Sequence, residues 1–329
     1  MRALVTGGAG YIGSNLVDDL LSRDYEVVVL DDFSLGKREN VIHNLPNPSF
    51  RLLEGSITDP AIVSRAMEGC GLVFHLAARV GTKYIVDDPL RGILVNVNGT
   101  ETVLKEAYRR KIRVLLASTS EIYGKSEAIP FREDGDRLLG STSVARWSYS
   151  TAKALDEHMA LAYSREGLHV SIVRYFNSYG PRVDPIGYGS VIAKFITQAL
   201  TGKPLTVHGN GSQTRCFTFV KDTVEGTIVA ATTPQALGEV FNIGCKRESS
   251  LSNLASLVRA ITGSSSPITN IAYSEVFGPH FEDTPRRVPD VEKTRRVLGF
   301  EARVPLEEGL RLTVDWMRSR MTASPAGTA

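Results

Sequence analysis

The sequence predicts an α/β protein with a doubly wound parallel sheet and a smaller C-terminal part. Three observations support this prediction: short apolar runs that do not alternate with polar residues, amphipathic stretches between them, and more frequent glycine and proline after about residue 176. Unalternating, β-branched runs are typical of strands that are buried on both faces, as in a parallel sheet. Repeated strand–helix units of this kind indicate helices on both faces of that sheet.

The elements are expected in alternating order through the first half of the chain. The strand runs are residues 3–5, 27–30, 72–74, 114–117 and 170–174. The helical stretches include residues 12–22, 60–68 and 98–110. After residue 176 glycine and proline become frequent and helices shorter, which predicts loops and small elements over the carboxyl edge of the sheet. We therefore divide the chain into a first domain, a second part and a flexible tail, at 1–176 (with some later segments returning to it), 177–320 and 321–329.

Composition is that of an ordinary globular protein and disfavours several classes of function. Hydrophobic residues make up 42% of the 329 residues and charged residues 22%, with a formal net charge of +2. This balance argues against nucleic acid or a membrane as a partner. Three scattered cysteines and six histidines without ligand spacing predict neither disulfides nor a metal site, and they favour a cytoplasmic location. No signal peptide or transmembrane span is expected.

A glycine triplet follows the first strand and opens the first helix. Gly7, Gly10 and Gly13, with Tyr11 and Ile12 among them, have the spacing G-x-x-G-x-x-G. Without side chains the backbone turns tightly, and its N–H groups can approach a pyrophosphate at the helix N-terminus. Because strand, triplet and helix come in this order, the segment predicts a Rossmann-type dinucleotide site.

An acid at the end of the second strand selects the dinucleotide. The Asp31 carboxylate can accept hydrogen bonds from both ribose hydroxyls, and it would repel a 2′-phosphate. No arginine stands directly after the glycines or beside Asp31 to bind that phosphate. NAD is therefore the expected cofactor.

A tyrosine and a lysine four residues apart form the candidate catalytic pair. Tyr149 and Lys153 share one helix face at this spacing. A free phenol, with a pKa of about 10, is a poor base at neutral pH. The Lys153 cation and the positive nicotinamide both favour the phenolate, so the pKa of Tyr149 is expected to fall. The alternative is an exposed helix pair without function.

Further motifs give the chain a resemblance to a known family. Residues 118–124 (Ser-Thr-Ser-Glu-Ile-Tyr-Gly) follow one strand, and residues 177–182 (Asn-Ser-Tyr-Gly-Pro-Arg) follow the next. With the glycine triplet, they resemble the extended short-chain dehydrogenase/reductase family of nucleotide-sugar enzymes. The resemblance implies a catalytic trio of Thr119, Tyr149 and Lys153, in which Thr119 hydrogen-bonds the reacting hydroxyl. It also implies cofactor contacts from Ser56, Ile57, Ala77, Tyr149 and Lys153, and a structural role for His75.

Within that family, the residues after Thr119 separate the reactions. Dehydratases carry an Asp-Glu pair there, whereas this chain has Ser120-Glu121. Thr-Ser-Glu is similar to the UDP-glucuronic acid decarboxylases, which include UDP-xylose synthases. Tyr84, the run Arg-Trp-Ser-Tyr at 146–149 and the segment 283–290 with Arg287 are similar to the same enzymes. A 4-epimerase is the closest alternative, a 4,6-dehydratase fits less well, and a non-catalytic NAD(H)-sensing protein is a third reading.

The resemblance implies oxidation at C4 of a UDP-hexuronic acid, loss of carbon dioxide and return of hydride. Tyr149 and Thr119 would stabilise the enolate, and Arg287 or Glu121, through a water, would supply the proton to C5. Arg182 is a second candidate for pairing the sugar carboxylate, because guanidinium binds a carboxylate bidentately. Fold-stabilising ion pairs are the alternative for both arginines. Expected substrate contacts come from Tyr84, Ser120, Asn177, Arg182 and Arg215. Of these, Asn177 and Arg215 are expected near the nucleotide.

Three residues depart from the family pattern, and one expectation concerns assembly. Ser56 stands where many relatives have an aspartate that contacts adenine, Arg79 where a smaller or neutral residue is usual, and Cys216 where aspartate or alanine is commoner. The family often forms homodimers through a four-helix bundle. Residues 98–110 and 149–165 would supply the two helices of each subunit.

Overall fold

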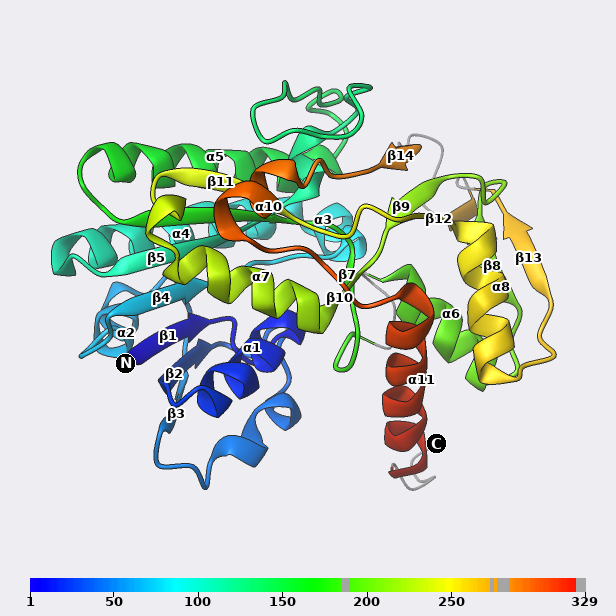
Figure 1. The fold of residues 1–329 in the computed structure, drawn as a ribbon, viewed down its shortest axis with the longest axis horizontal. Helices are drawn as coiled ribbons and strands as arrows, with labels where there is room; N and C mark the ends of the chain where they lie inside the picture. The colour runs from blue at the N-terminus through cyan, green and yellow to red at the C-terminus, as the bar shows by residue number, and fades with distance from the viewer. Residues whose placement is uncertain (185–189, 273–274, 277–283, 324–329) are drawn as a thin grey trace.

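A parallel sheet of seven strands organises the protein, for which a computed structural model describes residues 1–184, 190–272, 275–276 and 284–323. The strand order is β11-β6-β5-β4-β1-β2-β3, and every neighbouring pair is parallel (Figure 1). Because the order reverses direction at β1, a crevice opens between the carboxyl ends of β1 and β4, where ligands bind in such sheets. The strands are β1 Arg2–Thr6, β2 Glu26–Asp31, β3 Phe50–Glu54, β4 Leu72–His75, β5 Arg113–Thr119, β6 Val170–Tyr175 and β11 Glu239–Ile243.

Helices cover both faces of this sheet (Figure 1). Helices α1 (Tyr11–Ser22) and α7 (Val220–Thr232) pack on one face. Helices α2 (Pro60–Ala66), α4 (Pro89–Arg110) and α5 (Trp147–Arg165) pack on the other. Alternate β1 side chains serve the two cores, since Ala3 and Val5 belong to the first and Leu4 to the second. The doubly wound α/β prediction is confirmed.

The described residues of the C-terminal part form helices and small sheets. Besides α7 and α10 (Glu292–Leu298), the helices are α6 Val191–Leu200, α8 Leu251–Thr262 and α11 Leu306–Ala323. The small sheets pair β8 (Leu205–His208) with β13 (Ile268–Ile271), β7 (Ser178–Tyr179) with β10 (Thr218–Phe219), and β12-β9-β14 (Glu248–Ser250, Thr214–Cys216, Arg286–Arg287). Phe195, Leu254 and Leu310 belong to the same core as α1 and α7, so this part continues the main domain's core.

The structure adds to the elements that the sequence indicated. All five expected strands are present, and β3 and β11 extend the sheet on its two edges. Helix α4 begins at Pro89, earlier than expected, because Asp88 caps it by accepting from the Arg91 N–H at 3.2 Å. Helix α11 contradicts the expectation of short helices, since it has 18 residues. It also includes the first residues of the expected tail, whose positions 324–329 lie outside the described residues.

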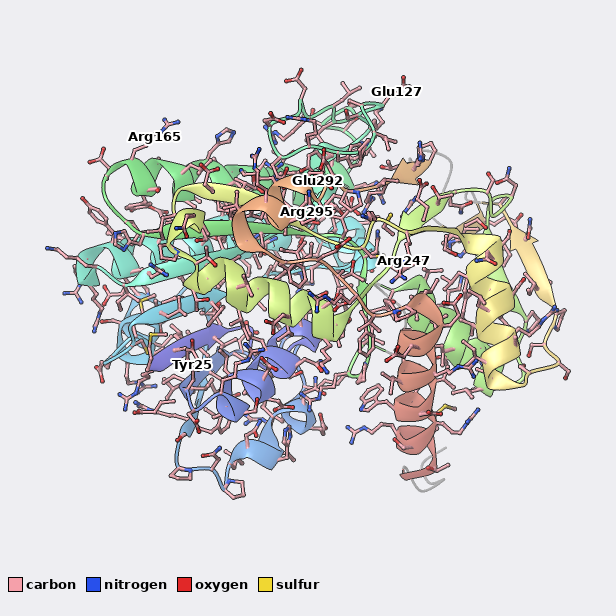
Figure 2. All side chains as sticks on the ribbon, in the orientation of Figure 1. Tyr25, Glu127, Arg165, Arg247, Glu292 and Arg295 are labelled. Atoms are coloured by element: carbon pink, nitrogen blue, oxygen red, sulfur yellow. The ribbon has the colours of Figure 1, made fainter. Side chains whose placement is uncertain are left out.

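Charged side chains are distributed over the surface with both signs interspersed. Glu127 and Arg165 point away from the ribbon, and Arg295 pairs with Glu292 at 2.8 Å on α10, Glu292–Leu298 (Figure 2). Of the helices described here, none is long and apolar enough to cross a membrane.

Candidate active site

A cavity of about 450 Å³ follows the carboxyl ends of the central strands. Its volume lies in the usual range for ligand sites. Most residues predicted for the site line this cavity: Gly7, Gly10, Tyr11, Ile12, Gly13, Asp31, Ile57, Ala77, Tyr84, Thr119, Ser120, Glu121, Tyr149, Asn177 and Arg287. Segments far apart in the sequence therefore meet where the strand order reverses.

The glycine loop fits a dinucleotide pyrophosphate. A Cβ on Gly7 would lie 2.7 Å from the Ala77 nitrogen, and a Cβ on Gly13 would lie 2.1 Å from the Gly7 oxygen. The loop therefore folds only with glycine at both positions. Gly10 is the N-cap of α1 and has no side chain to cap the first turn, which contains no acid. The first N–H groups of the helix are thus available to an anion.

Asp31 is held in place for the ribose. It is 7% exposed, its Oδ2 accepts from the Ala9 N–H and its Oδ1 from the Phe33 N–H, both at 2.9 Å. Burial raises the pKa of Asp31, and these two backbone hydrogen bonds oppose that rise. Each oxygen keeps a second lone pair for a ribose hydroxyl. Ile57 lines the neighbouring wall, whereas Ser56 does not and its Oγ lies 2.8 Å from Thr58 Oγ1.

Tyr149 and Thr119, two members of the expected catalytic trio, lie together in the cavity wall. Their hydroxyls are hydrogen-bonded to each other. Burial raises the pKa of Tyr149, the carboxylates of Glu121 and Asp156 raise it further, and the Thr119 hydrogen bond lowers it. Burial and the chain's own carboxylates therefore oppose the expected fall of this pKa, and the combined effect of Lys153 and the nicotinamide stays a prediction. Lys153 itself is buried and pairs with Asp156 at 2.9 Å.

Two guanidinium groups converge on Glu121. Arg287 Nη1 lies 2.8 Å from its Oε1 and Arg146 Nη2 lies 3.3 Å from its Oε2. Burial disfavours the carboxylate, but Arg287 and Arg146, with Arg215 behind them, outweigh burial and lower the pKa of Glu121 to about 2. The carboxylate is thus an anion at neutral pH. The sequence singled out Arg146 only as part of a motif, and the structure places it in the cavity wall.

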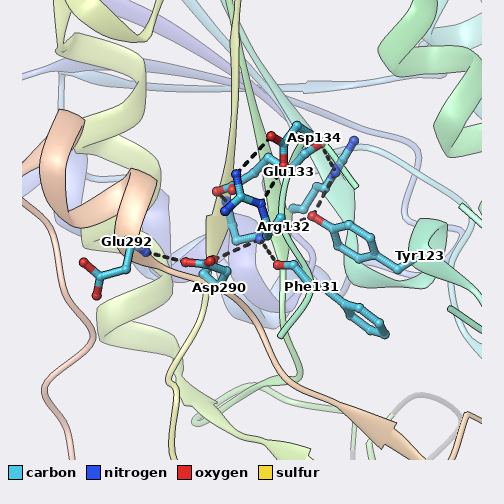
Figure 3. A network of polar contacts seen from close by, with 9 residues as sticks. Tyr123, Phe131, Arg132, Glu133, Asp134, Asp290 and Glu292 are labelled. Atoms are coloured by element: carbon cyan, nitrogen blue, oxygen red, sulfur yellow. Dashed lines mark hydrogen bonds and ion pairs between the residues drawn. The ribbon is translucent and has the colours of Figure 1, made fainter. Parts of the chain in front are cut away.

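The segment that carries Arg287 is fastened to the main sheet (Figure 3). The Phe131 N–H donates to the Val288 oxygen at 2.8 Å, and the Asp290 N–H donates to the Phe131 oxygen at 2.9 Å. Asn242, at the end of β11, donates to the oxygens of Phe131 and Asp290 at 2.8 and 3.0 Å. Strand β14 adds a parallel register in which Arg287 lies opposite Arg215. Arg287 is therefore positioned by residues remote from it in sequence.

Four predicted residues lie outside the wall of the cavity, namely Ser56, Lys153, Arg182 and Arg215, and one departure lies within it. Arg182 pairs with Asp18 of α1 at 2.5 Å. Arg215 donates to the Thr214 oxygen at 2.8 Å, and Lys153 lies one helical turn beyond Tyr149. Arg79 lines the cavity, with its guanidinium carbon 5.5 Å from the Tyr84 ring centre.

Other residues discussed from the sequence have mainly structural contacts. Asn177 lines the cavity and donates to the Cys216 oxygen at 3.3 Å. His75 lies between Thr6 and Thr100, and burial lowers its pKa to about 3, so that the ring is neutral. Among the described residues, no cluster of three or more His, Cys, Asp or Glu side chains could hold a metal ion.

The glycine loop, Asp31 and the Tyr149–Thr119 pair on a doubly wound sheet define an NAD-dependent enzyme. Residues 3–244 match the model of the NAD dependent epimerase/dehydratase family, and the chain belongs to this family.

Several characterised proteins are similar over almost the whole chain. A UDP-N-acetyl-alpha-D-glucosaminuronate decarboxylase from Bacillus cytotoxicus is 42% identical over 96% of this chain and 98% of its own. UDP-glucuronic acid decarboxylase 1 from Xenopus tropicalis is 35% identical over 97% of this chain and 73% of its own. The UDP-glucuronic acid 4-epimerase from Bacillus cereus, solved with UDP-glucuronic acid and NAD, superimposes with a TM-score of 0.87 at 29% identity, over 97% of this chain and 100% of that one.

Proposed function

We propose that the chain is an NAD-dependent decarboxylase of UDP-glucuronic acid that acts through oxidation at C4. Its products would be UDP-4-keto-pentose, UDP-xylose or both. The observation that carries the proposal is the convergence of Arg287 and Arg146 on Glu121, beside Thr119 and Tyr149. The first-mentioned relatives, which are decarboxylases of UDP-linked hexuronic acids by name, support it.

The residues of the cavity fit NAD. Gly7, Gly10 and Gly13 would hold its pyrophosphate, Asp31 its ribose and Ile57 the adenine side, while Ala77 lines the path toward Tyr149. When bound, NAD supplies the acceptor and later the donor of hydride at the sugar carbon. Lys153, which lies one helical turn after Tyr149 on α5, would favour the phenolate form of Tyr149.

Tyr149 would move the proton of the sugar hydroxyl. Its phenolate accepts that proton during oxidation, and the phenol returns it when the ketone is reduced. Thr119, hydrogen-bonded to Tyr149, would orient the same hydroxyl and then share in stabilising the enolate oxygen. Ser120 and Tyr84, which line the cavity, would contact the sugar ring.

The arginines would select an acidic sugar. Arg287 and Arg146 bring two positive charges to one carboxylate, Glu121, so the cluster carries an excess charge that suits a hexuronate. Glu121 repels a second carboxylate, which favours its departure as neutral carbon dioxide. Because its pKa is about 2, Glu121 would not be the acid at C5 itself. It would instead orient a water that Arg287 polarises. Arg146 takes the place considered for Arg182, which pairs with Asp18.

Nucleotide recognition would fall to the second part of the chain, 177–320. Asn177 lines the cavity, and Arg215 lies behind it, opposite Arg287 in the small sheet. A cation and an amide at this place would offset the negative charge of the diphosphate.

Product analysis tests the proposal. Purified protein with NAD is incubated with UDP-glucuronic acid and, separately, with UDP-N-acetylglucosaminuronic acid, which the 42% identical relative's name makes the second candidate. Release of carbon dioxide with a UDP-pentose supports the proposal. UDP-galacturonic acid without gas would instead establish a 4-epimerase, and loss of water without gas a dehydratase, against which Ser120 argues.

Replacing Tyr149 separates an enzyme from an NAD(H)-sensing protein. Tyr149→Phe removes the group that transfers the proton, so kcat should fall by about 10²–10⁴-fold. NAD binding, measured by calorimetry, should stay within about threefold, because the glycine loop and Asp31 supply the cofactor contacts. Turnover that survives this substitution would remove Tyr149 from the mechanism.

We also propose a cytoplasmic homodimer that pairs α4 and α5 from each subunit in a four-helix bundle. The two helices lie side by side, with the Tyr108 and Tyr163 ring centres 5.4 Å apart (Figure 1). Large apolar side chains stay exposed on both helices, namely Leu90, Ile93, Leu94 and Leu155. Molar mass by light scattering tests the assembly. The scattered cysteines, free in the structure, support the location.

A further inference from the structure

Arg79 lines the candidate active site with a charged side chain that the proposed reaction leaves unused. The side chain is 15% exposed, so its guanidinium has lost most of its contact with water. Its Nε is buried without a hydrogen-bond partner among the described residues, and its Nη2 lies 4.0 Å from Oδ2 of Asp88, beyond hydrogen-bonding distance. Buried charges in proteins are normally paired and hydrogen-bonded. This guanidinium is therefore suited to an anion that enters the cavity with a ligand.

The position of Arg79 is fixed from helix α4 and helix α3 (Thr82–Asp87). The Arg79 N–H donates to Oδ1 of Asn96 at 2.7 Å, and Nδ2 of Asn96 donates to the Arg79 oxygen at 3.2 Å. Asn96 is 1% exposed, so both hydrogen bonds are shielded from water. At the other end, the guanidinium carbon lies 5.5 Å from the centre of the Tyr84 ring, within the range of a cation–π contact. A side chain held at both ends loses little freedom when a ligand binds.

These contacts place Arg79 on the side of the sheet that carries Tyr149. Helix α4, to which Arg79 is bonded, packs on the same face as α5. Helix α1, whose N-terminus would hold the dinucleotide pyrophosphate, packs on the opposite face. Arg91 and Val95 of α4 also line the cavity. The expected anion therefore belongs to the molecule that approaches Tyr149, and the pyrophosphate has its own site at α1.

Two other arginines of the cavity share a carboxylate of the protein. Arg287 and Arg146 pair with Glu121 at 2.8 and 3.3 Å, so part of their charge is neutralised within the chain. Arg79 faces Asp88 only at 4.0 Å, which leaves its planar fork of N–H donors open to a ligand. Such a fork binds a carboxylate bidentately. A hexuronic acid carries a carboxylate at C6, whereas a neutral hexose carries only a hydroxyl there.

We propose that Arg79 is a specificity-determining residue that binds the carboxylate of the hexuronic acid and thereby selects an acidic sugar over a neutral one. The inference rests on the proposed function in taking a UDP-linked hexuronic acid as the ligand. Loss of carbon dioxide removes the group that Arg79 binds, so the product is held less tightly than the substrate. Asp88, which is 44% exposed and partly screened by solvent, weakens the attraction because its charge opposes that of Arg79.

The test compares UDP-glucuronic acid with UDP-glucose, which differ only at C6. Both Kd values are measured by calorimetry on NAD-loaded protein that carries Tyr149→Phe, so that the sugars are not turned over. In this background UDP-glucuronic acid should bind more tightly than UDP-glucose. Adding Arg79→Gln should reduce the preference about tenfold, because the charge-assisted hydrogen bonds to the carboxylate are lost. The Kd values for UDP-glucose and for NAD should stay within about twofold.

Arg91→Gln is the matched control. Arg91 also lines the cavity, but it is exposed, so that solvent screens its charge. The preference for the acidic sugar should stay within about twofold in this variant. Arg79→Lys keeps the charge but loses the planar fork. It should recover part of the preference and remain about threefold below the protein with arginine.

Asp88→Asn gives a second readout in which Arg79 itself is unchanged. Asparagine caps a helix as well as aspartate does, so α4 should keep its first turn. Because the negative charge near Arg79 is removed, the preference for UDP-glucuronic acid should rise about twofold to threefold. This variant decides the question if Arg79→Gln does not fold.

Two results would overturn the proposal. One is that Arg79→Gln weakens both sugars equally or weakens NAD instead, which would assign the guanidinium to a phosphate. The other is an unchanged preference in Asp88→Asn. An Arg79-dependent preference together with an epimer and no carbon dioxide would contradict the proposed decarboxylation alone. Decarboxylation with a preference that survives Arg79→Gln would contradict the role of Arg79 alone, and a protein without any preference for the acidic sugar would contradict both.

Discussion

At the scale of single residues, Glu121 sets the charge of the candidate site. Burial alone would favour its neutral form, but Arg287 and Arg146 bind both oxygens and keep the pKa at about 2. The side chain is 26% exposed, so solvent screens the pair only in part. A carboxylate held by two guanidinium groups both limits the charge of the site and leaves it positive. This balance suits a sugar that enters with a carboxylate and leaves without one.

Acid titration should reveal this cluster. The folded pKa of Glu121 is below its ordinary value of 4.5, so its stabilising effect is complete above pH 4.5 and is lost as pH falls to about 2. The difference in free energy of unfolding between the natural protein and Glu121→Gln should be about 3 kcal/mol at pH 7 and shrink by roughly half at pH 3. Urea unfolding at several pH values measures it. A difference that is constant with pH would contradict the ion-paired assignment.

A second carboxylate provides the control for activity. Glu106 on α4 also has a pKa of about 2, held by hydrogen bonds from Arg109 and Arg110. Glu106→Gln should show a similar acid dependence of stability but leave turnover within about twofold. Glu121→Gln should lower turnover by about 10²-fold or more.

Most of the candidate site could be predicted from the sequence because its residues stand in local motifs. Thr119 and Glu121 stand at and after the end of one strand, and Tyr149 lies on one helix, so local motifs together with the family resemblance indicated them. The partners of the arginines could not be predicted in this way. Arg182 meets Asp18, and Arg146 meets Glu121, through contacts between segments with no common motif.

At the scale of elements, the turn from β1 into α1 is built by close backbone contacts. Gly7 has a φ of +70° and its Cα faces the backbone of Ala77, at the end of the neighbouring strand β4. Gly13, inside the first turn of α1, faces the Gly7 oxygen. The helix N-terminus therefore sits directly over the gap between β1 and β4, where the strand order reverses. Its position, more than its sequence, makes it the anion site of the cavity.

Gly13→Ala should weaken cofactor binding strongly. The new Cβ would lie 2.1 Å from the Gly7 oxygen, so the loop has to move away from α1 and the free N–H groups lose their common direction. We expect the Kd for NAD to rise about 100-fold, as measured by calorimetry. Gly92→Ala on α4 is the control: nothing lies within 4 Å of its Cβ, so it should keep NAD affinity and add about 0.5–1 kcal/mol of stability. Equal NAD affinity in the two variants would contradict this account of the loop.

The elements were predictable where their pattern is local. The buried runs of β1, β2, β4 and β5 are apolar without interruption, the run of β6 contains Ser171 and Arg174, and the structure confirms each of the five strands. The edge strands β3 and β11 are more exposed on their outer sides and have a mixed pattern, so only pairing with a neighbour makes them strands. The start of α4 had a usable signal in Asp88-Pro89, an N-cap followed by proline at the first helical position.

At the scale of the whole molecule, one core and one polar network join the sheet to the C-terminal part. The first core reaches from Leu16 on α1 to Leu310 on α11. The polar network is centred on Asn242, which is fully buried at the edge of the main sheet. Its Oδ1 accepts from the Tyr123 hydroxyl at 2.7 Å, and its amide holds the backbone of Phe131 and Asp290 (Figure 3). Contacts of this kind join residues more than a hundred positions apart, and no local pattern predicts them.

Asn242→Ala should therefore separate catalysis from cofactor binding. The variant removes one hydrogen-bond partner each from the Tyr123 hydroxyl and the backbone oxygens of Phe131 and Asp290, which should cost about 2–4 kcal/mol in urea unfolding. The segment with Arg287 loses one of its attachments to the main sheet, so turnover should fall about tenfold. NAD affinity should stay within about threefold, because the glycine loop and Asp31 lie on the other side of the sheet's switch point. Asn270→Ala, at an exposed position of β13, should change stability by less than about 0.5 kcal/mol. If Asn242→Ala lowered NAD affinity as much as turnover, the contacts of Asn242 would support the whole cavity and not Arg287 in particular.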